Sequence, residues 1–139
     1  MKTIIVGGAG FIGSRLAGRI IADSQGGAVL VYDNFSSGTS AHLEGIADSG
    51  RLEVVKADVK DLDRLCQAME GADTVWHFAS NPDIARAVRE PEVDFWEGTF
   101  LTNNVVEAMR RVGVKNLIYA SGSGVYGDTG QIPAGENYA

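Results

Sequence analysis

Residues 7–13 of the chain read Gly7-Gly8-Ala9-Gly10-Phe11-Ile12-Gly13, with glycine at the first, fourth and seventh positions of the stretch. A short apolar run at residues 3–6 precedes it, and apolar side chains at helical spacing follow it over residues 11–22. A strand, a glycine turn and a helix in this order are typical of the loop that binds the phosphates of a dinucleotide. The alternative is an ordinary strand–helix turn, but such a turn needs only one or two glycines.

Three glycines of this loop have an expected task. Gly7 allows the tight turn, Gly10 lets the backbone approach a pyrophosphate, and Gly13 lets the helix pack closely on the strand. Phe11 and Ile12 begin the helix, whose first turn offers free backbone N–H groups and a partial positive charge. We therefore expect these five residues to bind a cofactor phosphate through backbone groups.

A carboxylate follows at the distance that a dinucleotide site requires. Asp33 ends the expected second strand, 20 residues after Gly13, where an acidic side chain binds the ribose hydroxyls of the adenosine half. The same charge repels the 2′-phosphate of NADP, and residues 34–38 contain no Lys or Arg that would attract it. The sequence therefore favours NAD as the cofactor; a turn-forming Asp33 is the alternative.

The rest of the chain alternates apolar strands with amphipathic helices. Such alternation predicts a parallel sheet with right-handed crossovers, here an α/β fold with a Rossmann-type doubly wound sheet. The expected strands are residues 3–6, 28–32, 52–56, 74–78 and 116–120. The expected helices are residues 11–22, 41–47, 62–69 and 94–112. We expect one cofactor-binding domain over residues 1–139, truncated after the fifth strand and without a substrate-binding part.

Composition argues against several classes of partner. The chain has 12 Lys and Arg against 18 Asp and Glu, a net charge of −6 that repels nucleic acid. The single cysteine, Cys66, permits no internal disulfide and no cysteine cluster for a metal, which suits a reducing cytoplasm. No stretch is long and apolar enough to span a bilayer. We expect a cytoplasmic protein with no metal site and with neither a membrane nor a nucleic-acid partner.

Further motifs resemble the extended short-chain dehydrogenase/reductase family, specifically its nucleotide-sugar epimerases and dehydratases, such as UDP-glucose 4-epimerases. The resemblance covers the whole chain; its motifs are specific for the family but say little about the substrate. They are the glycine loop and residues 32–38 (YDNFSSG), 57–59 (ADV), 75–80 (VWHFAS), 106–110 (VEAMR) and 119–128 (YASGSGVYGD).

The resemblance implies that NAD lies against the ends of three strands. Asp58 and Val59 would meet the adenine, although a helix N-cap is an alternative role for Asp58. His77 is expected to pack locally rather than to act in catalysis. The implied cofactor-binding residues are Asn34, Ser37 and Gly38 after the second strand, Asp58 and Val59 after the third, and Phe78, Ala79 and Ser80 after the fourth.

The resemblance also implies the chemistry, a transient hydride transfer between a sugar and NAD. In the family, a tyrosine paired with a lysine four residues later removes a hydroxyl proton, and a Ser or Thr hydrogen-bonds the same hydroxyl. This sequence contains no Tyr-x-x-x-Lys, which in the family lies beyond the point where the sequence stops. The Ser/Thr position falls on Gly122, so the flanking Ser121 and Ser123 are the candidate catalytic residues, with Ser123 preferred. Two serines in a small-residue loop are the alternative.

A second departure concerns Gly98. Alignment on residues 106–108 puts Gly98 where the family keeps an Asn near the cofactor. We expect the NAD-binding portion of a nucleotide-sugar epimerase with a UDP-sugar substrate, inactive as the chain stands. A non-catalytic NAD-binding module and a dehydratase or reductase of the same superfamily are the alternatives.

One segment resembles the part of the family that faces a dimer partner. It comprises residues 83–90, to which Phe95, Trp96 and Phe100 can add apolar surface. A homodimer is therefore one expectation. Core aromatics of a single amphipathic helix explain the same residues equally well.

Overall fold

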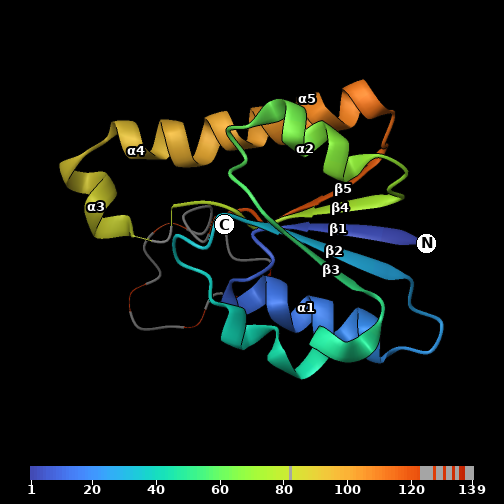
Figure 1. The fold of residues 1–139 in the computed structure, drawn as a ribbon. Helices are drawn as coiled ribbons and strands as arrows, with labels where there is room; N and C mark the ends of the chain where they lie inside the picture. The colour runs from blue at the N-terminus through green and yellow to red at the C-terminus, as the bar shows by residue number, and fades with distance from the viewer. Residues whose placement is uncertain (82, 123–126, 128–129, 131–132, 134, 137–139) are drawn as a thin grey trace.

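A computed structural model describes residues 1–81, 83–122, 127, 130, 133 and 135–136 of the chain. Within them, five parallel strands form one sheet in the order β3-β2-β1-β4-β5 (Figure 1). The strands are β1 (Lys2–Val6), β2 (Ala28–Asp33), β3 (Leu52–Lys56), β4 (Thr74–His77) and β5 (Asn116–Tyr119). The Rossmann-type parallel sheet expected from the sequence is confirmed.

Helices cover both faces of this sheet, as a doubly wound fold requires (Figure 1). On one face lies α1 (Phe11–Ala22), and on the other lie α2 (Leu62–Met69) and α5 (Phe100–Val112). The short helix expected over residues 41–47 is instead two 3₁₀ turns, η1 (Ser40–His42) and η2 (Glu44–Ser49). Both turns lie on the side of α1, where the buried side chain of Leu43, between them, joins the core.

The long helix expected over residues 94–112 is divided. It begins as α4 (Glu92–Asp94), continues as the π-helical segment η3 (Phe95–Thr99) and becomes regular only at α5. A further helix, α3 (Ile84–Arg89), precedes it and projects with α4 from the end of the molecule (Figure 1). Short π-helical segments occur mostly within longer helices and often lie at functional sites.

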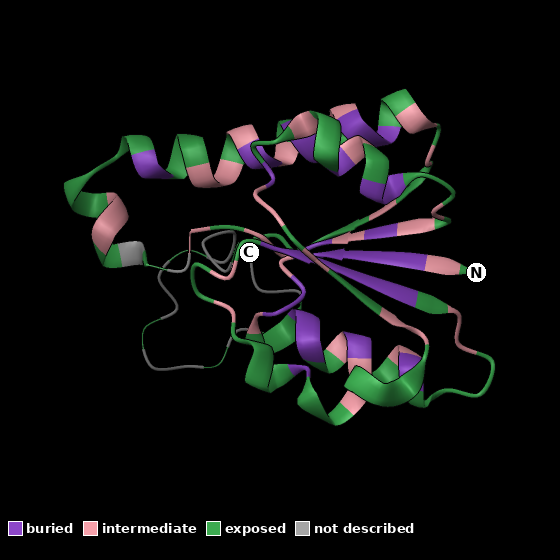
Figure 2. Ribbon diagram, viewed as in Figure 1, coloured by how far each residue is buried: buried purple, intermediate pink, exposed green. Residues whose placement is uncertain are grey.

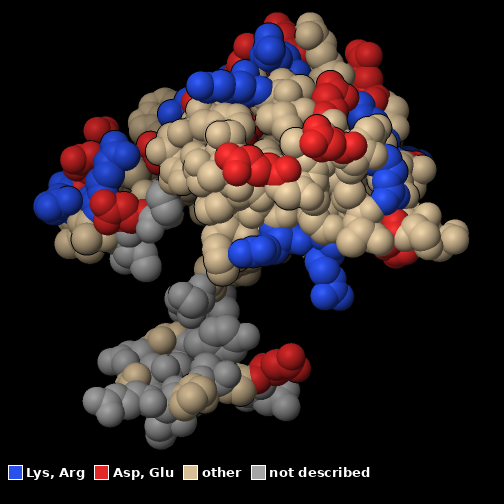
Figure 3. Space-filling model, turned by 60° about the horizontal axis from the view of Figure 1, so that its bottom comes forward, with Lys and Arg blue, Asp and Glu red and all other residues tan. Residues whose placement is uncertain are grey.

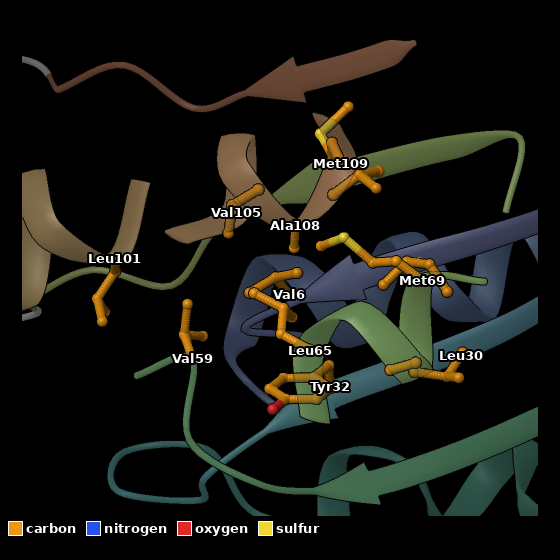
Figure 4. Packing of buried hydrophobic residues seen from close by; sticks show 13 residues of the cluster. Val6, Leu30, Tyr32, Val59, Leu65, Met69, Leu101, Val105, Ala108 and Met109 are labelled. Carbon is orange, nitrogen blue, oxygen red and sulfur yellow. The ribbon is translucent and has the colours of Figure 1, made fainter. Parts of the chain in front are cut away.

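Alternate strand residues feed two apolar layers, because successive side chains of a strand point to opposite faces of the sheet. Figure 2 shows the buried residues concentrated along the central strands. Towards α1, the layer contains Ile5, Val29 and Val31. Towards α2 and α5, Val6, Leu30 and Tyr32 meet side chains of both helices (Figure 4). The helix residues in that second layer are Leu65 and Met69 of α2 and Leu101, Val105, Ala108 and Met109 of α5.

The order of the strands fixes where a ligand site can form. β1 lies between β2 and β4, so the chain winds outward to one side from β1 and then to the other. Val6 pairs with Tyr32 on one side and with His77 on the other, so the carboxyl ends of the three strands lie level. In open α/β sheets this reversal leaves a crevice at those ends, and ligands bind there.

The described helices are all unsuited to crossing a membrane, because none of them is both long enough and apolar enough.

Candidate functional site

A cavity of about 590 Å³ opens at the carboxyl ends of β1, β2 and β4. Its size falls within the range of pockets that hold cofactors and other small ligands. The predicted cofactor-binding residues all line it, apart from Gly38. They are Gly7, Gly10, Phe11, Ile12, Gly13, Asp33, Asn34, Ser37, Asp58, Val59, Phe78, Ala79 and Ser80.

The glycine loop leaves no room for side chains at its two ends. Gly7 has a left-handed backbone (φ 80°), and a Cβ there would lie 2.6 Å from the backbone nitrogen of Ala79. A Cβ on Gly13 would lie 2.5 Å from the carbonyl oxygen of Gly7. At Gly10, by contrast, a Cβ would have only the Gly7 oxygen nearby, at 3.4 Å. Gly10 lines the cavity, so a side chain at this position would occupy space meant for a ligand.

The amino end of α1 faces the cavity without a side-chain cap. Gly10 is the N-cap residue, no side chain accepts a hydrogen bond from the first turn, and that turn contains no acidic residue. The first helical hydrogen bond runs from Ser14 N–H to the Gly10 carbonyl, at 3.0 Å. Phe11, Ile12 and Gly13 line the cavity ahead of that bond. Uncapped N–H groups and the helix dipole both favour an anion at this place.

Asp33 ends β2 beside the glycine loop, where its carboxylate is already ordered. Its Oδ2 accepts a hydrogen bond from Ala9 N–H at 2.9 Å, and its Oδ1 accepts one from Phe35 N–H at 2.7 Å. The second bond accompanies a left-handed backbone at Phe35 (φ 60°). Asp33 therefore stabilises a turn and also lines the cavity. Each carboxylate oxygen keeps a lone pair for a ligand hydroxyl.

Asp58 is the second ordered carboxylate of the cavity. Its Oδ2 accepts a hydrogen bond from the Asn34 amide at 3.0 Å, and its Oδ1 accepts one from Lys60 N–H at 2.9 Å. Burial raises the pKa of Asp58, but these hydrogen bonds outweigh it, so the pKa lies below its ordinary value. The helix N-cap considered for Asp58 is provided by Asp61, which accepts from Arg64 N–H. Asp58 is thus free of the capping role and faces the cavity.

Tyr32 also lines the cavity, although it was not predicted as a site residue. Its hydroxyl donates a hydrogen bond to the Asp58 carbonyl at 3.0 Å, which joins the end of β2 to the loop after β3. Burial, followed by the negative charge of Asp61, raises the pKa of Tyr32 to about 12. The phenol therefore stays protonated and acts as a fixed donor.

Asn104 of α5 holds the same loop from the other side. This buried side chain donates a hydrogen bond to the Val59 carbonyl at 3.0 Å. Asn104 is not among the site residues predicted from the sequence, and the structure gives it this supporting position. A buried amide with a backbone acceptor has no signature in the sequence, because the partner is 45 residues away.

The far wall of the cavity comes from the projecting helices. Asp83 and Arg86 of the α3 region, Glu97 of η3 and Leu101 of α5 line it. Gly98, which the alignment placed at an Asn position, is absent from the described lining, whereas its neighbour Glu97 is present. None of these four residues was predicted, because their approach to the glycine loop depends on how α3 and the π-helical segment pack.

Two predicted positions, Gly38 and Ser121, do not belong to the described lining of the cavity. A Cβ on Gly38 would lie 2.8 Å from the Ala9 carbonyl carbon, so Gly38 packs the loop after β2 against the glycine loop. Ser121 is exposed and does not belong to the described lining. Ser123, the preferred catalytic serine, lies outside the residues that the structure describes. Both catalytic assignments stay predictions.

His77 is buried at the end of β4 and faces α5. Its Nε2 lies 3.1 Å from the Thr102 hydroxyl, and its ring lies beside that of Tyr119. Nδ1 has no hydrogen-bond partner among the residues described. Burial lowers the pKa of His77 to about 4, so the ring is neutral at pH 7. His77 is not among the described lining residues of the cavity.

These features together fit a dinucleotide. An uncapped helix terminus suits a pyrophosphate, the open space at Gly10 allows close approach, and an ordered carboxylate at Asp33 suits ribose hydroxyls. The fold and the cavity therefore define a dinucleotide-binding protein of the Rossmann class. Within that class, a family model described as the NAD dependent epimerase/dehydratase family matches residues 3–139, and the chain belongs to this family.

Individual relatives agree with this assignment. The chain is 34% identical to a UDP-glucose 4-epimerase of Mycolicibacterium smegmatis, over 99% of this chain and 44% of the relative. It is 35% identical to a CDP-paratose 2-epimerase of Salmonella typhi, over 98% of this chain and 41% of the relative. A crystal structure of UDP-glucose 4-epimerase from Brucella ovis in complex with NAD superposes with a TM-score of 0.83 and 31% identity, over 99% of this chain and 41% of that one. The chain thus spans less than half the length of these relatives.

Proposed function

We propose that this chain is the NAD-binding portion of a nucleotide-sugar epimerase, of the type that interconverts UDP-sugars. The observation that carries the proposal is one cavity formed by the uncapped helix terminus after Gly10 and the ordered carboxylate of Asp33. The names of the relatives support the epimerase assignment.

Each wall of the cavity has a proposed part in holding the cofactor. The first turn of α1 donates backbone hydrogen bonds to the pyrophosphate, while Asp33 accepts from the adenosine ribose. Asp58 and Asn34, ordered by their mutual hydrogen bond, take the adenine end. The N–H of Phe78 donates to the Val6 carbonyl at 2.8 Å, which fixes the backbone after β4. This backbone lies along the other half of the cofactor.

NAD, when bound, supplies a hydride acceptor for the oxidation of a sugar carbon. The residues described here bind and orient it. The proton of the sugar hydroxyl needs a base, and this sequence contains no Tyr-x-x-x-Lys pair for that step. We propose that the chain alone binds NAD but does not epimerise a sugar.

The first experiment is a calorimetric titration of the chain with NAD and, separately, with NADP. We expect tighter binding of NAD, because Asp33 accepts from ribose hydroxyls and repels a 2′-phosphate. The variant Asp33→Ala should weaken NAD binding about 10- to 100-fold, the range for a hydrogen bond to a charged group. Equal affinity of Asp33→Ala and wild type for NAD would refute the assigned cofactor orientation.

Asp33 also orders the loop, so a control must separate binding from folding. Asp33→Ala leaves the N–H groups of Ala9 and Phe35 without their acceptor, whereas Asp33→Asn keeps one acceptor oxygen. The thermal midpoint of both variants should be measured beside the titration. A loss of affinity in Asp33→Asn with an unchanged midpoint identifies a role for the carboxylate in binding.

A non-catalytic NAD-binding module is the second candidate. Gly122 favours it, because this exposed residue stands where the family has its Ser or Thr. The candidates separate in a hydride-transfer assay with a UDP-sugar on the longest natural product of the gene. Appearance of NADH absorbance or of the epimerised sugar would exclude the module.

A homodimer is a further proposal. Phe95 and Trp96 are exposed on η3, in contact with each other, and Val88 is exposed on α3. An exposed apolar surface of this kind marks an interaction site. Sedimentation velocity of wild type and a Trp96→Glu variant tests it: a wild-type monomer excludes the dimer.

A further inference from the structure

Acidic side chains outnumber basic ones in the lining of the cavity. The described lining contains four carboxylates, Asp33, Asp58, Asp83 and Glu97, but only two cations, Lys60 and Arg86. A ligand with a pyrophosphate brings further negative charge into this acidic cavity. A cation in the lining reduces the repulsion between this charge and the carboxylates, so the positions of Lys60 and Arg86 matter.

Lys60 and Arg86 lie at different parts of the cavity. Lys60 follows Asp58 and Val59 in the loop after β3, at the wall assigned to the adenine. Arg86 lies on α3, across the cavity from the glycine loop. Figure 3 shows that basic and acidic side chains gather together on the projecting end of the molecule that α3 and α4 form. Arg86 is therefore the cation that the far wall offers to a phosphate group.

The guanidinium of Arg86 is held by two carboxylates. Its Nε donates to Glu90 Oε2 at 3.1 Å, one turn later on the same helix, and its Nη1 donates to Glu97 Oε1 at 3.4 Å. Nη2 makes no hydrogen bond within the described part of the chain. About two fifths of the Arg86 side chain is exposed, so these pairs are partly in water. Exposed ion pairs contribute little to stability, whereas a planar guanidinium binds phosphate oxygens through paired, charge-assisted hydrogen bonds.

The π-helical turn explains why Glu97 reaches this place. Glu97 lies inside η3, where the widened helix replaces a regular turn. The carboxylate of Glu97 thus meets a residue 11 positions earlier, across the chain reversal between α3 and α4. This contact joins the projecting α3 to the long helix and points Arg86 at the cavity.

We propose that Arg86 binds a phosphate group of the ligand, and that Glu97 holds its guanidinium in place until the ligand arrives. On binding, phosphate oxygens replace the Glu97 carboxylate as the partner of Nη1 and also accept a hydrogen bond from Nη2. The inference rests on the proposed nucleotide-binding function. The phosphate belongs either to the dinucleotide or to a nucleoside-diphosphate sugar, since both carry the same diphosphate chemistry.

The test is calorimetry on the full chain with NAD, ADP-ribose, adenosine and UDP as separate probes. Arg86→Ala should weaken NAD and ADP-ribose binding about 10- to 100-fold and leave adenosine, which has no phosphate, unchanged. Arg86→Lys should recover part of the loss, because it keeps the charge but not the planar fork. Arg89→Ala is the matched control, since Arg89 lies exposed on the same short helix and outside the described lining.

The probes separate the two sources of the phosphate. Weaker binding of NAD in Arg86→Ala assigns the contact to the dinucleotide, and weaker binding of UDP alone assigns it to the sugar nucleotide. Unchanged binding of both overturns the inference. If the wild-type chain binds neither NAD nor UDP, the proposed function is refuted as well. This outcome differs from failure of the inference alone, in which the wild-type chain binds a ligand and Arg86→Ala binds it equally well.

A second variant tests the part assigned to Glu97. Glu97→Gln removes the competing charge and leaves the helix intact, so NAD should bind about 2- to 5-fold more tightly, on the scale of an exposed ion pair. Weaker NAD binding by Glu97→Gln would contradict the proposed exchange.

Discussion

At the scale of the residue, Gly13 shows how a missing side chain builds the site. It lies in the first turn of α1, where a Cβ would come within 2.5 Å of the Gly7 oxygen and 2.7 Å of the Gly8 Cα. Both neighbours are backbone atoms and cannot rotate away as a side chain can. The close contact between helix and loop is what holds the N–H groups of α1 at the edge of the cavity.

Gly13→Ala is therefore expected to destabilise the fold by about 1–3 kcal/mol, the usual effect of overpacking, and to weaken NAD binding by displacing the loop. Gly18→Ala is the control in the same helix, because a Cβ there meets only Ile46 Cγ2, at 4.0 Å. Replacing glycine inside a helix at such a place stabilises by about 0.5–1 kcal/mol. Urea denaturation of both variants measures the contrast; equal effects would contradict the packing role of Gly13.

At the scale of the element, β4 and α5 are joined through the buried ring of His77. Its Nε2 meets the hydroxyl of Thr102, one residue after Leu101, which lines the cavity. The strand end and the helix that form one side of the cavity thus share a polar contact inside an apolar layer. Because burial lowers the pKa of His77 to about 4, the ring in this contact is neutral at pH 7.

This burial makes the fold sensitive to acid. An unfolded His takes up its proton near pH 6.5, whereas the folded His77 resists protonation until about pH 4. Above pH 6.5 the ring is neutral in both states and stability is complete. As the pH falls from 6.5 to 4, the unfolded state binds the extra proton, and about 3 kcal/mol of stability is lost. Denaturation at a series of pH values should show this slope.

The variant His77→Gln keeps a polar side chain but cannot titrate. It should lose the part of the pH dependence that lies between pH 6.5 and 4, although its stability at neutral pH is lower. A His77→Gln protein with the wild-type slope would assign the acid sensitivity to groups other than His77.

At the scale of the whole molecule, local signals predicted the sheet and one wall of the site. Short apolar runs identify strands that are buried on both faces. The spacing of Gly7, Gly13 and Asp33 within one strand–helix–strand unit indicates a dinucleotide site. The opposite wall carries no such signal. Arg86 and Glu97 reach the cavity because α3 projects and a π-helical turn interrupts a longer helix, and both features depend on packing between distant segments.

The same distinction explains the smaller departures. Residues 41–47 have the composition of a short helix, yet they form 3₁₀ turns around Leu43, whose burial under the sheet decides the local backbone. A tertiary contact thus overrides what the neighbouring residues favour. Gly38 packs its backbone on Ala9, and its predicted part in cofactor binding stays a prediction.

The level strand ends described above have a thermodynamic consequence. The cavity consists of segments that are far apart along the chain and meet only when β1, β2 and β4 are paired. A chain without that pairing has no cavity, so a ligand that fills it binds the native state alone. Occupancy then adds to the free energy of unfolding, by about 2.7 kcal/mol at a free ligand concentration of one hundred times Kd. The resistance of the protein to unfolding and proteolysis would therefore rise with the logarithm of the free cofactor concentration.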